Sequence, residues 1–152
     1  MIELPQGGTE YGRRRTEAAS KARQDGRPRG GGRPPGYQWG LEILDLSTQE
    51  ARGFLSDTQY SHVAQQFRQL CREDEPTTSA LVGVRPIDDF HELRDKGGPL
   101  GRINVRVFFF VHHERRNLVI LGCINKKNDG STPLGDVRRM ARRKRLYLET
   151  LT

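Results

Sequence analysis

The sequence predicts an α+β domain in which a small, mostly antiparallel sheet packs against two helices near the start of the domain. Two patterns carry this prediction. Apolar residues alternate with other residues over 102–111, as in a strand, and they recur at helical spacing over 57–71, as on one face of a helix. The connections between the later strands are short, which favours antiparallel pairing. The expected order is strand, helix, helix, strand, strand, strand, helix.

The chain divides into two parts. Its 152 residues suit one domain, or one domain with an extension. Residues 1–36 contain eight glycines and four prolines and show no periodic apolar face, so they bury too little surface to offset the entropy of ordering them. We therefore expect a flexible Arg/Gly/Pro-rich extension over 1–36 and a folded domain over 37–152. The extension is either a solvated tail or an auxiliary arm for nucleic acid.

The first half of the domain is expected to form one strand and two helices. Alternating apolar residues predict the strand over 38–45. Ser47 and Glu50 have the spacing of a capping box, which predicts a short helix after the strand. Asp57 is placed to cap the longer helix that follows, and the acidic segment around Pro76 ends that helix.

The second half is expected to be mainly sheet. Its strand candidates are residues 81–84, 90–94, 102–111 and 118–124. Pro86 limits the first of them, because proline cannot donate to a strand ladder. A final helix is expected over 133–148, with the Thr132 hydroxyl as its cap and Pro133 at its first position.

Basic residues dominate the charge. The chain has 26 Lys and Arg against 19 Asp and Glu, a net charge of +7 and a pI near 9.9. Residues 102–146 carry +9, whereas residues 37–101 carry −5. This asymmetry favours a polyanionic partner such as nucleic acid. The final helix supplies six cations in eight residues, on more than one of its faces: Arg138, Arg139, Arg142, Arg143, Lys144 and Arg145.

The sequence lacks the signatures of membrane, secreted and metal-binding proteins. Its apolar runs fall far short of the ~20 residues that span a bilayer, and its opening residues contain no apolar signal segment. Cys71 and Cys123 lie 52 positions apart, which excludes a disulfide framework and a CxxC zinc pair. The four histidines share no metal-ligand spacing. We therefore expect a cytoplasmic protein that uses no cofactor and no metal.

Arg106 is the most informative single residue. It lies in the middle of the strand predicted over 102–111, where burying a lone charge is costly. Either it pairs with a carboxylate of a neighbouring strand, or its guanidinium lies on an open sheet face and is aimed at a phosphate, which a planar fork binds in bidentate fashion. Lys126 and Lys127 follow the next strand, and a hairpin brings them near Arg102 and Arg106. The alternative is that these lysines belong to a solvated loop.

Motifs over residues 90–148 resemble a known family. They are His91-Glu92-Leu93-Arg94, Gly101–Phe110, Leu118–Gly122, Lys126-Lys127 and Thr132-Pro133. In this order they resemble the RelE/HigB-type toxins of bacterial type II toxin–antitoxin systems, which belong to the RelE/ParE superfamily. The chain departs from that pattern in residues 128–131, which lengthen the loop, and in residues 1–36, which have no counterpart.

The resemblance implies an endoribonuclease that cuts mRNA on the ribosome, inhibits translation and is restrained by a cognate antitoxin protein. In that family the substrate 2′-hydroxyl attacks the adjacent phosphate without a metal, and basic side chains on the sheet stabilise the developing charge. Matching positions assigns catalytic roles to Arg106, Lys126 and Lys127, with His91 as the group for proton transfer. Tyr147 is an alternative titratable group, but it lies far along the final helix. The expected RNA contacts are Arg94, Arg102, Arg138, Arg142 and Arg145.

Two other functions remain open. A non-catalytic protein of the same fold would poison DNA gyrase, as the ParE branch does. A basic protein without activity would bind nucleic acid or the ribosome passively, with affinity that falls steeply with salt. ParE-like proteins lack the basic catalytic set, so the combination of Arg106, His91 and the two loop lysines favours the ribonuclease.

Overall fold

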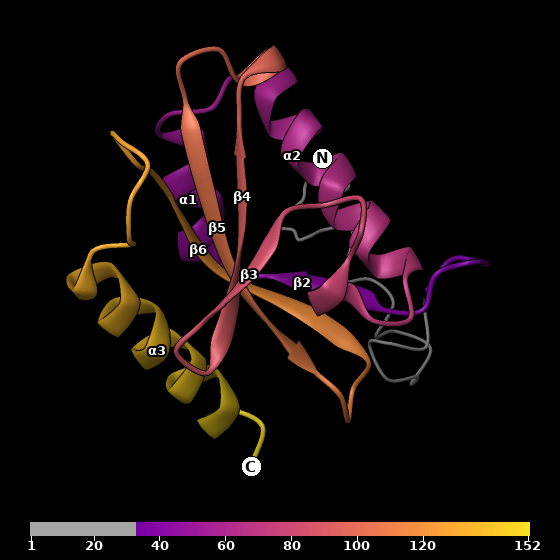
Figure 1. Ribbon diagram of the computed structural model, residues 1–152. Coiled ribbons are helices and arrows are strands. Elements are labelled where there is room, and N and C mark those ends of the chain that lie inside the picture. Colours follow the sequence, from indigo (N-terminus) through magenta and orange to yellow (C-terminus); the bar gives the residue numbers. More distant parts are fainter. Residues whose placement is uncertain (1–32) are drawn as a thin grey trace.

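The computed structural model describes residues 33–152, and the extension predicted over 1–36 lies almost entirely outside these residues. The described chain forms three helices and a five-stranded sheet (Figure 1). In chain order the elements are β2 (Gly40–Ile43), α1 (Asp45–Arg52), α2 (Asp57–Arg72), the 3₁₀ turn η3 (Pro76–Thr78), β3 (Val84–Ile87), β4 (Phe90–Lys96), the 3₁₀ turn η4 (Gly98–Leu100), β5 (Asn104–His112), β6 (Asn117–Asn125) and α3 (Leu134–Glu149).

The sheet has the order β2-β6-β5-β4-β3, and every pair is antiparallel except β2 with β6. The predicted α+β class is confirmed. Four strands follow the helices instead of the expected three, because β3 pairs with β4 as an edge strand. Pro86 lies inside β3 instead of limiting it. An edge position tolerates proline, since one side of the strand needs no donor.

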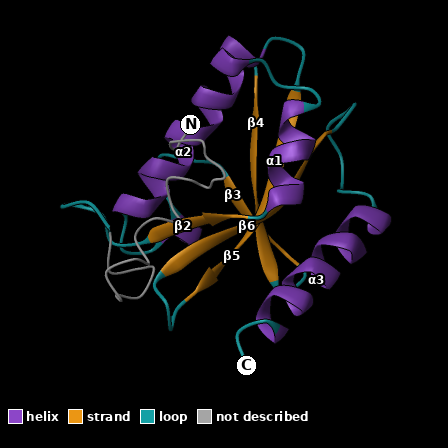
Figure 2. Cartoon of the chain, turned by 180° about the vertical axis from the view of Figure 1, so that it is seen from behind, coloured by secondary structure: helices purple, strands orange, loops and turns teal. Residues whose placement is uncertain are grey.

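The sheet is covered on both faces, and alternation along β5 decides which side chain enters which core. Val105, Val107 and Phe109 pack on the side of α1 and α2. Phe108 and Phe110 pack on the opposite side, beneath α3. Figures 1 and 2 show α2 and α3 on either side of the sheet. None of the helices in residues 33–152 is both long and apolar enough to cross a membrane.

Helix α1 packs beside β6 and bonds to it beyond the point where its pairing with β2 ends. The Glu50 carboxylate accepts a hydrogen bond from the Cys123 backbone N–H at 3.1 Å, and the Cys123 thiol donates to the Ser47 carbonyl at 3.7 Å. The capping box predicted from Ser47 and Glu50 is therefore wrong. The helix already begins at Asp45 without a side-chain cap, and the Glu50 carboxylate is held by Arg143 of α3.

The other two helices also begin differently from the prediction. Ser56, not Asp57, caps α2, and it forms a reciprocal capping box with Gln59. Helix α3 begins at Leu134 and has no side-chain cap, because the hydroxyl of Thr132 is engaged inside the domain. That engagement organises the candidate site.

Candidate nucleic-acid interface

Arg106 lies on the α3 side of the sheet and is almost completely buried, with 1% of its surface exposed. Its Nη1 donates to Oγ1 of Thr132 at 2.9 Å, and its Nη2 donates to the carbonyl of Gly130 at 2.6 Å. Its Nε has no partner within residues 33–152. The expectation of a guanidinium on an open sheet face is therefore wrong. The loop between β6 and α3 passes over Arg106 and occupies the fork.

A carboxylate of the neighbouring strand completes the network. Glu92 of β4 is 1% exposed, and its Oε1 accepts a hydrogen bond from the Thr132 hydroxyl at 2.6 Å. Its Oε2 accepts from Nε and Nη2 of Arg94, at 2.7 and 2.6 Å. The Thr132 hydroxyl thus joins Arg106 to Glu92. The alternative prediction was a salt bridge between Arg106 and a carboxylate of the neighbouring strand; within residues 33–152 no such direct pair forms, and Glu92 reaches Arg106 only through the Thr132 hydroxyl.

The electrostatics of Arg106 follow from its position. Burial lowers the pKa of the Arg106 guanidinium, and so does nearby Arg94, whereas Glu92 and Asp129 raise it. A guanidinium stays protonated in proteins even when its pKa is lowered. The network therefore holds two cations, Arg94 and Arg106, around one buried carboxylate. Arg94 and Arg106 lie opposite each other in the register of β4 and β5, so this end of the sheet carries positive charge.

Arg94 is the member of the network that reaches solvent. Its side chain is 29% exposed, and two of its nitrogens, Nε and Nη2, contact the same Glu92 oxygen, which fixes the orientation of the guanidinium. Arg85 of β3 lies opposite Glu92 in the strand register and is exposed. The sequence prediction missed Arg85. The signal was available, because Arg85 lies between Val84 and Pro86 in the strand that Pro86 was expected to limit.

The loop lysines lie at the same end of the sheet as Arg106, as predicted. Lys126 continues the β6 ladder by donating from its N–H to the carbonyl of Asn104 at 2.8 Å, and its Nζ contacts Asn128 Oδ1 at 2.6 Å. Lys127 is exposed. Lys96 pairs with Asp129 at 2.6 Å, and this contact lowers the pKa of the Asp129 carboxyl. Arg102 is exposed just before β5 begins.

His91 does not join this group, and the predicted convergence of His91 with Arg106 is wrong. His91 pairs with Phe109 in the strand register, and the two rings lie 6.0 Å apart on the α2 face of the sheet. Arg106 points to the other face because successive residues of a strand alternate. His91 instead lines a separate hollow of about 330 Å³, together with Trp39, His113 and Lys144. Burial, and then Lys144, lowers the pKa of His91.

The six cations of α3 divide into two sets. Three of them pair with acidic residues. Arg139 pairs with Asp136 and Glu50, Arg143 pairs with Glu50, and Lys144 pairs with Asp89. The other three are exposed and recur at positions i, i+4 and i+7, so they form one outward stripe: Arg138, Arg142 and Arg145. These are the three helix residues for which RNA contacts were expected.

Tyr147 serves to hold α3 on the sheet. Its ring is 9% exposed and packs against Phe110, and its hydroxyl donates to Glu42 of β2 at 2.6 Å. Tyr147 also lies near His112, at the end of β5 six residues beyond Arg106. At ~3.4 Å per residue that distance is on the order of 20 Å along the strand. Tyr147 therefore does not meet the Arg106 network.

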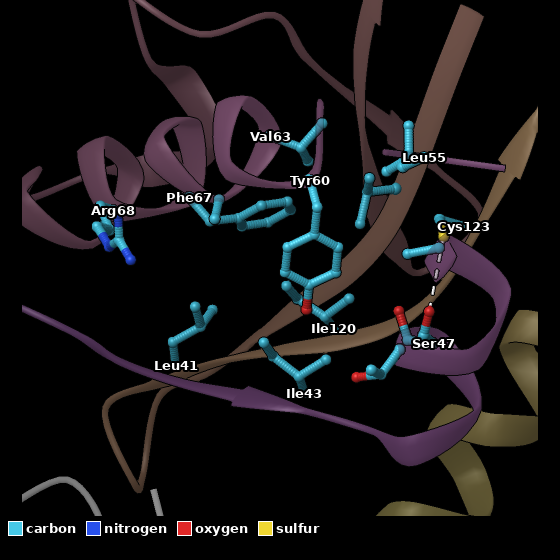
Figure 3. Close-up of a pocket in the computed structure, with 14 residues that line it drawn as sticks. Leu41, Ile43, Ser47, Leu55, Tyr60, Val63, Phe67, Arg68, Ile120 and Cys123 are labelled. Atoms are coloured by element: carbon cyan, nitrogen blue, oxygen red, sulfur yellow. Dashed lines mark hydrogen bonds between the residues drawn. The ribbon is translucent and has the colours of Figure 1, made fainter. Parts of the chain in front are cut away.

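A small apolar cavity lies on the other face of the sheet (Figure 3). It measures about 60 Å³ and lies between α1, α2 and the sheet, with Leu41, Ile43, Tyr60 and Phe67 among its walls. Its sulfur-bearing wall residue, Cys123, is buried, and burial raises the pKa of that thiol. This cavity has Arg68 in its wall and lies on the face of the sheet opposite the Arg106 network.

The part of the chain that the structure describes contains no group of three His, Cys, Asp or Glu side chains placed to hold a metal ion. The concentrated chemistry in this part is cationic. It comprises the Arg94–Glu92–Thr132–Arg106 network, the lysine loop and the α3 stripe. Such a surface provides electrostatic contacts for phosphates.

Comparisons with known proteins give similarity at the level of structure only. No protein-family model matches the sequence, and no curated protein matches it. Among solved structures, the chain is similar to a double-arginine mutant of the E. coli toxin RelE in the free state, with 13% identity, coverage of 70% of this chain and 97% of RelE, and a TM-score of 0.49. It is also similar to the toxin–antitoxin complex RelBE2 of Mycobacterium tuberculosis, with 14% identity, coverage of 60% and 95%, and a TM-score of 0.44.

Proposed function

We propose that this protein is a RelE-type toxin that acts on RNA in the cytoplasm as a metal-independent endoribonuclease. The observation that carries the proposal is the meeting of Arg94, the buried Arg106 and the Lys126–Lys127 loop at one end of one sheet face. Sequence segments far apart supply these cations, and a phosphate chain is the common partner of such a set. The α3 stripe extends the basic surface beyond the sheet.

In the proposed reaction the 2′-oxygen of a ribose attacks the adjacent phosphorus, and the bond to the 5′-oxygen breaks. The products are a 2′,3′-cyclic phosphate and a 5′-hydroxyl. Arg94 and Lys127 are the side chains we assign to the phosphate oxygens, where positive charge stabilises the transition state. The requirement for a 2′-hydroxyl restricts the reaction to RNA.

Two protons move in this reaction, one from the 2′-hydroxyl and one to the 5′-oxygen. All four histidines fall within residues 33–152, and none lies beside Arg106: His62 contacts Asp95 on the α2 side, His91 is on that same face, and His112 and His113 are at the far end of β5. We therefore assign proton transfer to Lys126, the loop lysine not assigned to the phosphate oxygens. This assignment replaces the one expected for His91.

The proposal is tested by inducing the full chain in bacteria and mapping RNA 5′ ends, with DNA breaks measured in parallel. We expect growth arrest and new RNA ends that carry a 5′-hydroxyl. The double variant Lys126→Ala/Lys127→Ala should lose both effects. Arg52→Ala/Arg72→Ala removes the same charge from α1 and α2 and should retain them. DNA breaks with intact RNA would point to gyrase poisoning and refute the ribonuclease.

A second candidate function is non-catalytic binding of RNA or the ribosome. The burial of Arg106 favours it, because the Arg106 fork is already engaged by Thr132 and Gly130. The two candidates separate on product formation. Binding that weakens steeply with salt, with no cleavage in cells or on translating ribosomes, supports the passive binder.

A toxin of this type requires a partner that restrains it, so the proposal includes a cognate antitoxin protein. We expect the gene adjacent to this one to encode a small protein whose co-expression abolishes the growth arrest. A stable complex of the two chains on size-exclusion chromatography would support this partner. Unrelieved arrest, with no complex formed, would count against it.

A further inference from the structure

Two residues of the buried network, Glu92 and Thr132, cannot themselves meet a ligand, yet their side chains bond only to each other and to the arginines Arg94 and Arg106. Glu92 is 1% exposed and Thr132 is 9% exposed. Thr132 holds Arg106 and Glu92, and Glu92 holds Arg94 through both Nε and Nη2. Their hydrogen bonds therefore fix the orientation of two cations, Arg94 and Arg106.

The same bonds fix the loop that carries the lysines. Arg106 binds the carbonyl of Gly130 and the hydroxyl of Thr132, so the C-terminal end of the loop is tied to β5. Lys126 ties the N-terminal end to β5 through the carbonyl of Asn104. Lys127 therefore lies on a short bridge that is anchored at both ends. A loop backbone held in this way loses little additional entropy when its residues bind a ligand.

We propose that Glu92 and Thr132 are positioning residues for RNA, which hold the Arg94 guanidinium and the Lys127 loop in the arrangement that contacts phosphates. This inference rests on the proposed function but concerns residues that touch no substrate. Arg106 also acts from within the protein, as the hub that ties Thr132 and Gly130 to β5. In this arrangement Arg106 does not contact a phosphate itself. It helps to hold Arg94 and the lysine loop in the positions from which they contact one.

The test compares Thr132→Val, Thr132→Ser and wild type in binding to a single-stranded RNA, at several salt concentrations and well below each melting temperature. Valine keeps the shape of threonine and removes the hydroxyl. Because one or two ordered side chains are released, we expect Thr132→Val to raise Kd by about threefold to tenfold. The slope of log K against log salt should fall by ~0.7 for each phosphate that the variant no longer neutralises. Thr132→Ser restores the hydroxyl and should remain within about twofold of wild type on the same entropy argument.

A purely structural role predicts a different result. It predicts that Thr132→Val lowers the melting temperature while Kd and the salt slope of the folded protein stay unchanged, and that result would overturn the inference. Thr58→Val, on the exposed surface of α2, is the control for the same chemical change. It should leave binding unaltered.

Glu92→Gln provides a second variant in case Thr132→Val does not fold. The amide oxygen still accepts from Thr132, but the charge that orients Arg94 is removed. Loss of a negative charge alone predicts tighter binding to a polyanion. Loss of positioning predicts weaker binding, which we expect. Unchanged or tighter binding by folded Glu92→Gln overturns the inference, whereas wild-type protein without salt-dependent RNA binding refutes the proposed function itself.

Discussion

Gly122 of β6 lies so close to Met140 of α3 that a Cβ atom at position 122 would be 2.5 Å from the Met140 Cε. The strand register explains this close approach. Phe108 pairs with Gly122 and Phe109 pairs with Ile120, so β6 has one extra residue at this point. The bulge turns Gly122 toward α3. Because Gly122 has no side chain, Met140 and Arg143 of the helix can pack directly against the strand backbone.

Gly122→Ala should therefore destabilise the fold. The new methyl group would overlap Met140 and the Arg143 guanidinium, which have little room to move because Met140 is fully buried and Glu50 holds Arg143. Overpacking of this kind costs about 1–3 kcal/mol of unfolding free energy. Chemical denaturation measures the change. Gly135→Ala, in the first turn of the same helix, has no atom near its added methyl group and should be neutral or stabilising. Equal stability of both variants would contradict the packing argument.

Arg143 should contribute more to stability than its neighbour Arg142. Its Nη1 and Nη2 contact both oxygens of Glu50, at 3.0 and 2.8 Å, and Nη1 also donates to the Leu121 carbonyl at 2.8 Å. Arg143→Ala removes these bonds from a site where the side chain is 12% exposed, and we expect a loss of roughly 2 kcal/mol. Arg142 is exposed, so thermal melting of Arg142→Ala should differ little from wild type. A matching loss in both variants would refute the assignment.

His91 should make the fold less stable in acid. Its pKa in the folded protein lies below the ordinary value of 6.5, because burial and then Lys144 disfavour the charged ring. The unfolded chain therefore binds a proton more readily. The free energy of unfolding decreases as pH falls from about 7 through the unfolded value and levels off below the folded pKa. In denaturation series over this range, His91→Asn should lose less stability than wild type. Parallel pH profiles would contradict it.

The outward stripe of α3 should set part of the salt dependence of RNA binding. Replacing Arg138, Arg142 and Arg145 by Gln removes up to three cations that face phosphates. The slope of log K against log salt should then fall by roughly 0.7 for each phosphate of single-stranded RNA that they neutralise. Fluorescence anisotropy measures this slope. The same replacements at Arg52, Arg68 and Arg72, on α1 and α2, match the loss of charge and should leave the slope nearly unchanged. Equal reductions would show that only net charge matters.

The fold was predictable where local pattern and packing agree. Alternation in β5 predicted its two faces, and those faces contain Val107 and Phe109 on one side and Phe108 and Phe110 on the other. Helix starts were less predictable, because Glu50 and Thr132 have the residue types of caps but form tertiary bonds with α3 and β5. Tertiary partners compete with local capping, and the sequence does not display them.

The candidate site was predictable in part for the same reason. Alternation along the strand predicted that Arg106 and Val107 point to different faces of the sheet. Nothing local indicated that Thr132, 26 residues later, would cover Arg106. Phase along β4 decides that Arg94 shares the face of Arg106 and that His91 does not. That phase depends on the register between β4 and β5. The exposed stripe of α3 needed only helical spacing and the identity of the apolar face, and Arg138, Arg142 and Arg145 were expected there.

Amide chemical shifts of the full-length protein show whether RNA binds across the α3 side of the sheet. A short single-stranded RNA is titrated into labelled protein at moderate salt. We expect the shift changes among described residues to cluster at β4 around Arg94, at the 126–133 loop and in the first turns of α3, while α2 stays unperturbed. Shifts centred on α2, or none at all at protein concentrations near 100 μM, roughly the upper range of non-specific dissociation constants, would contradict it.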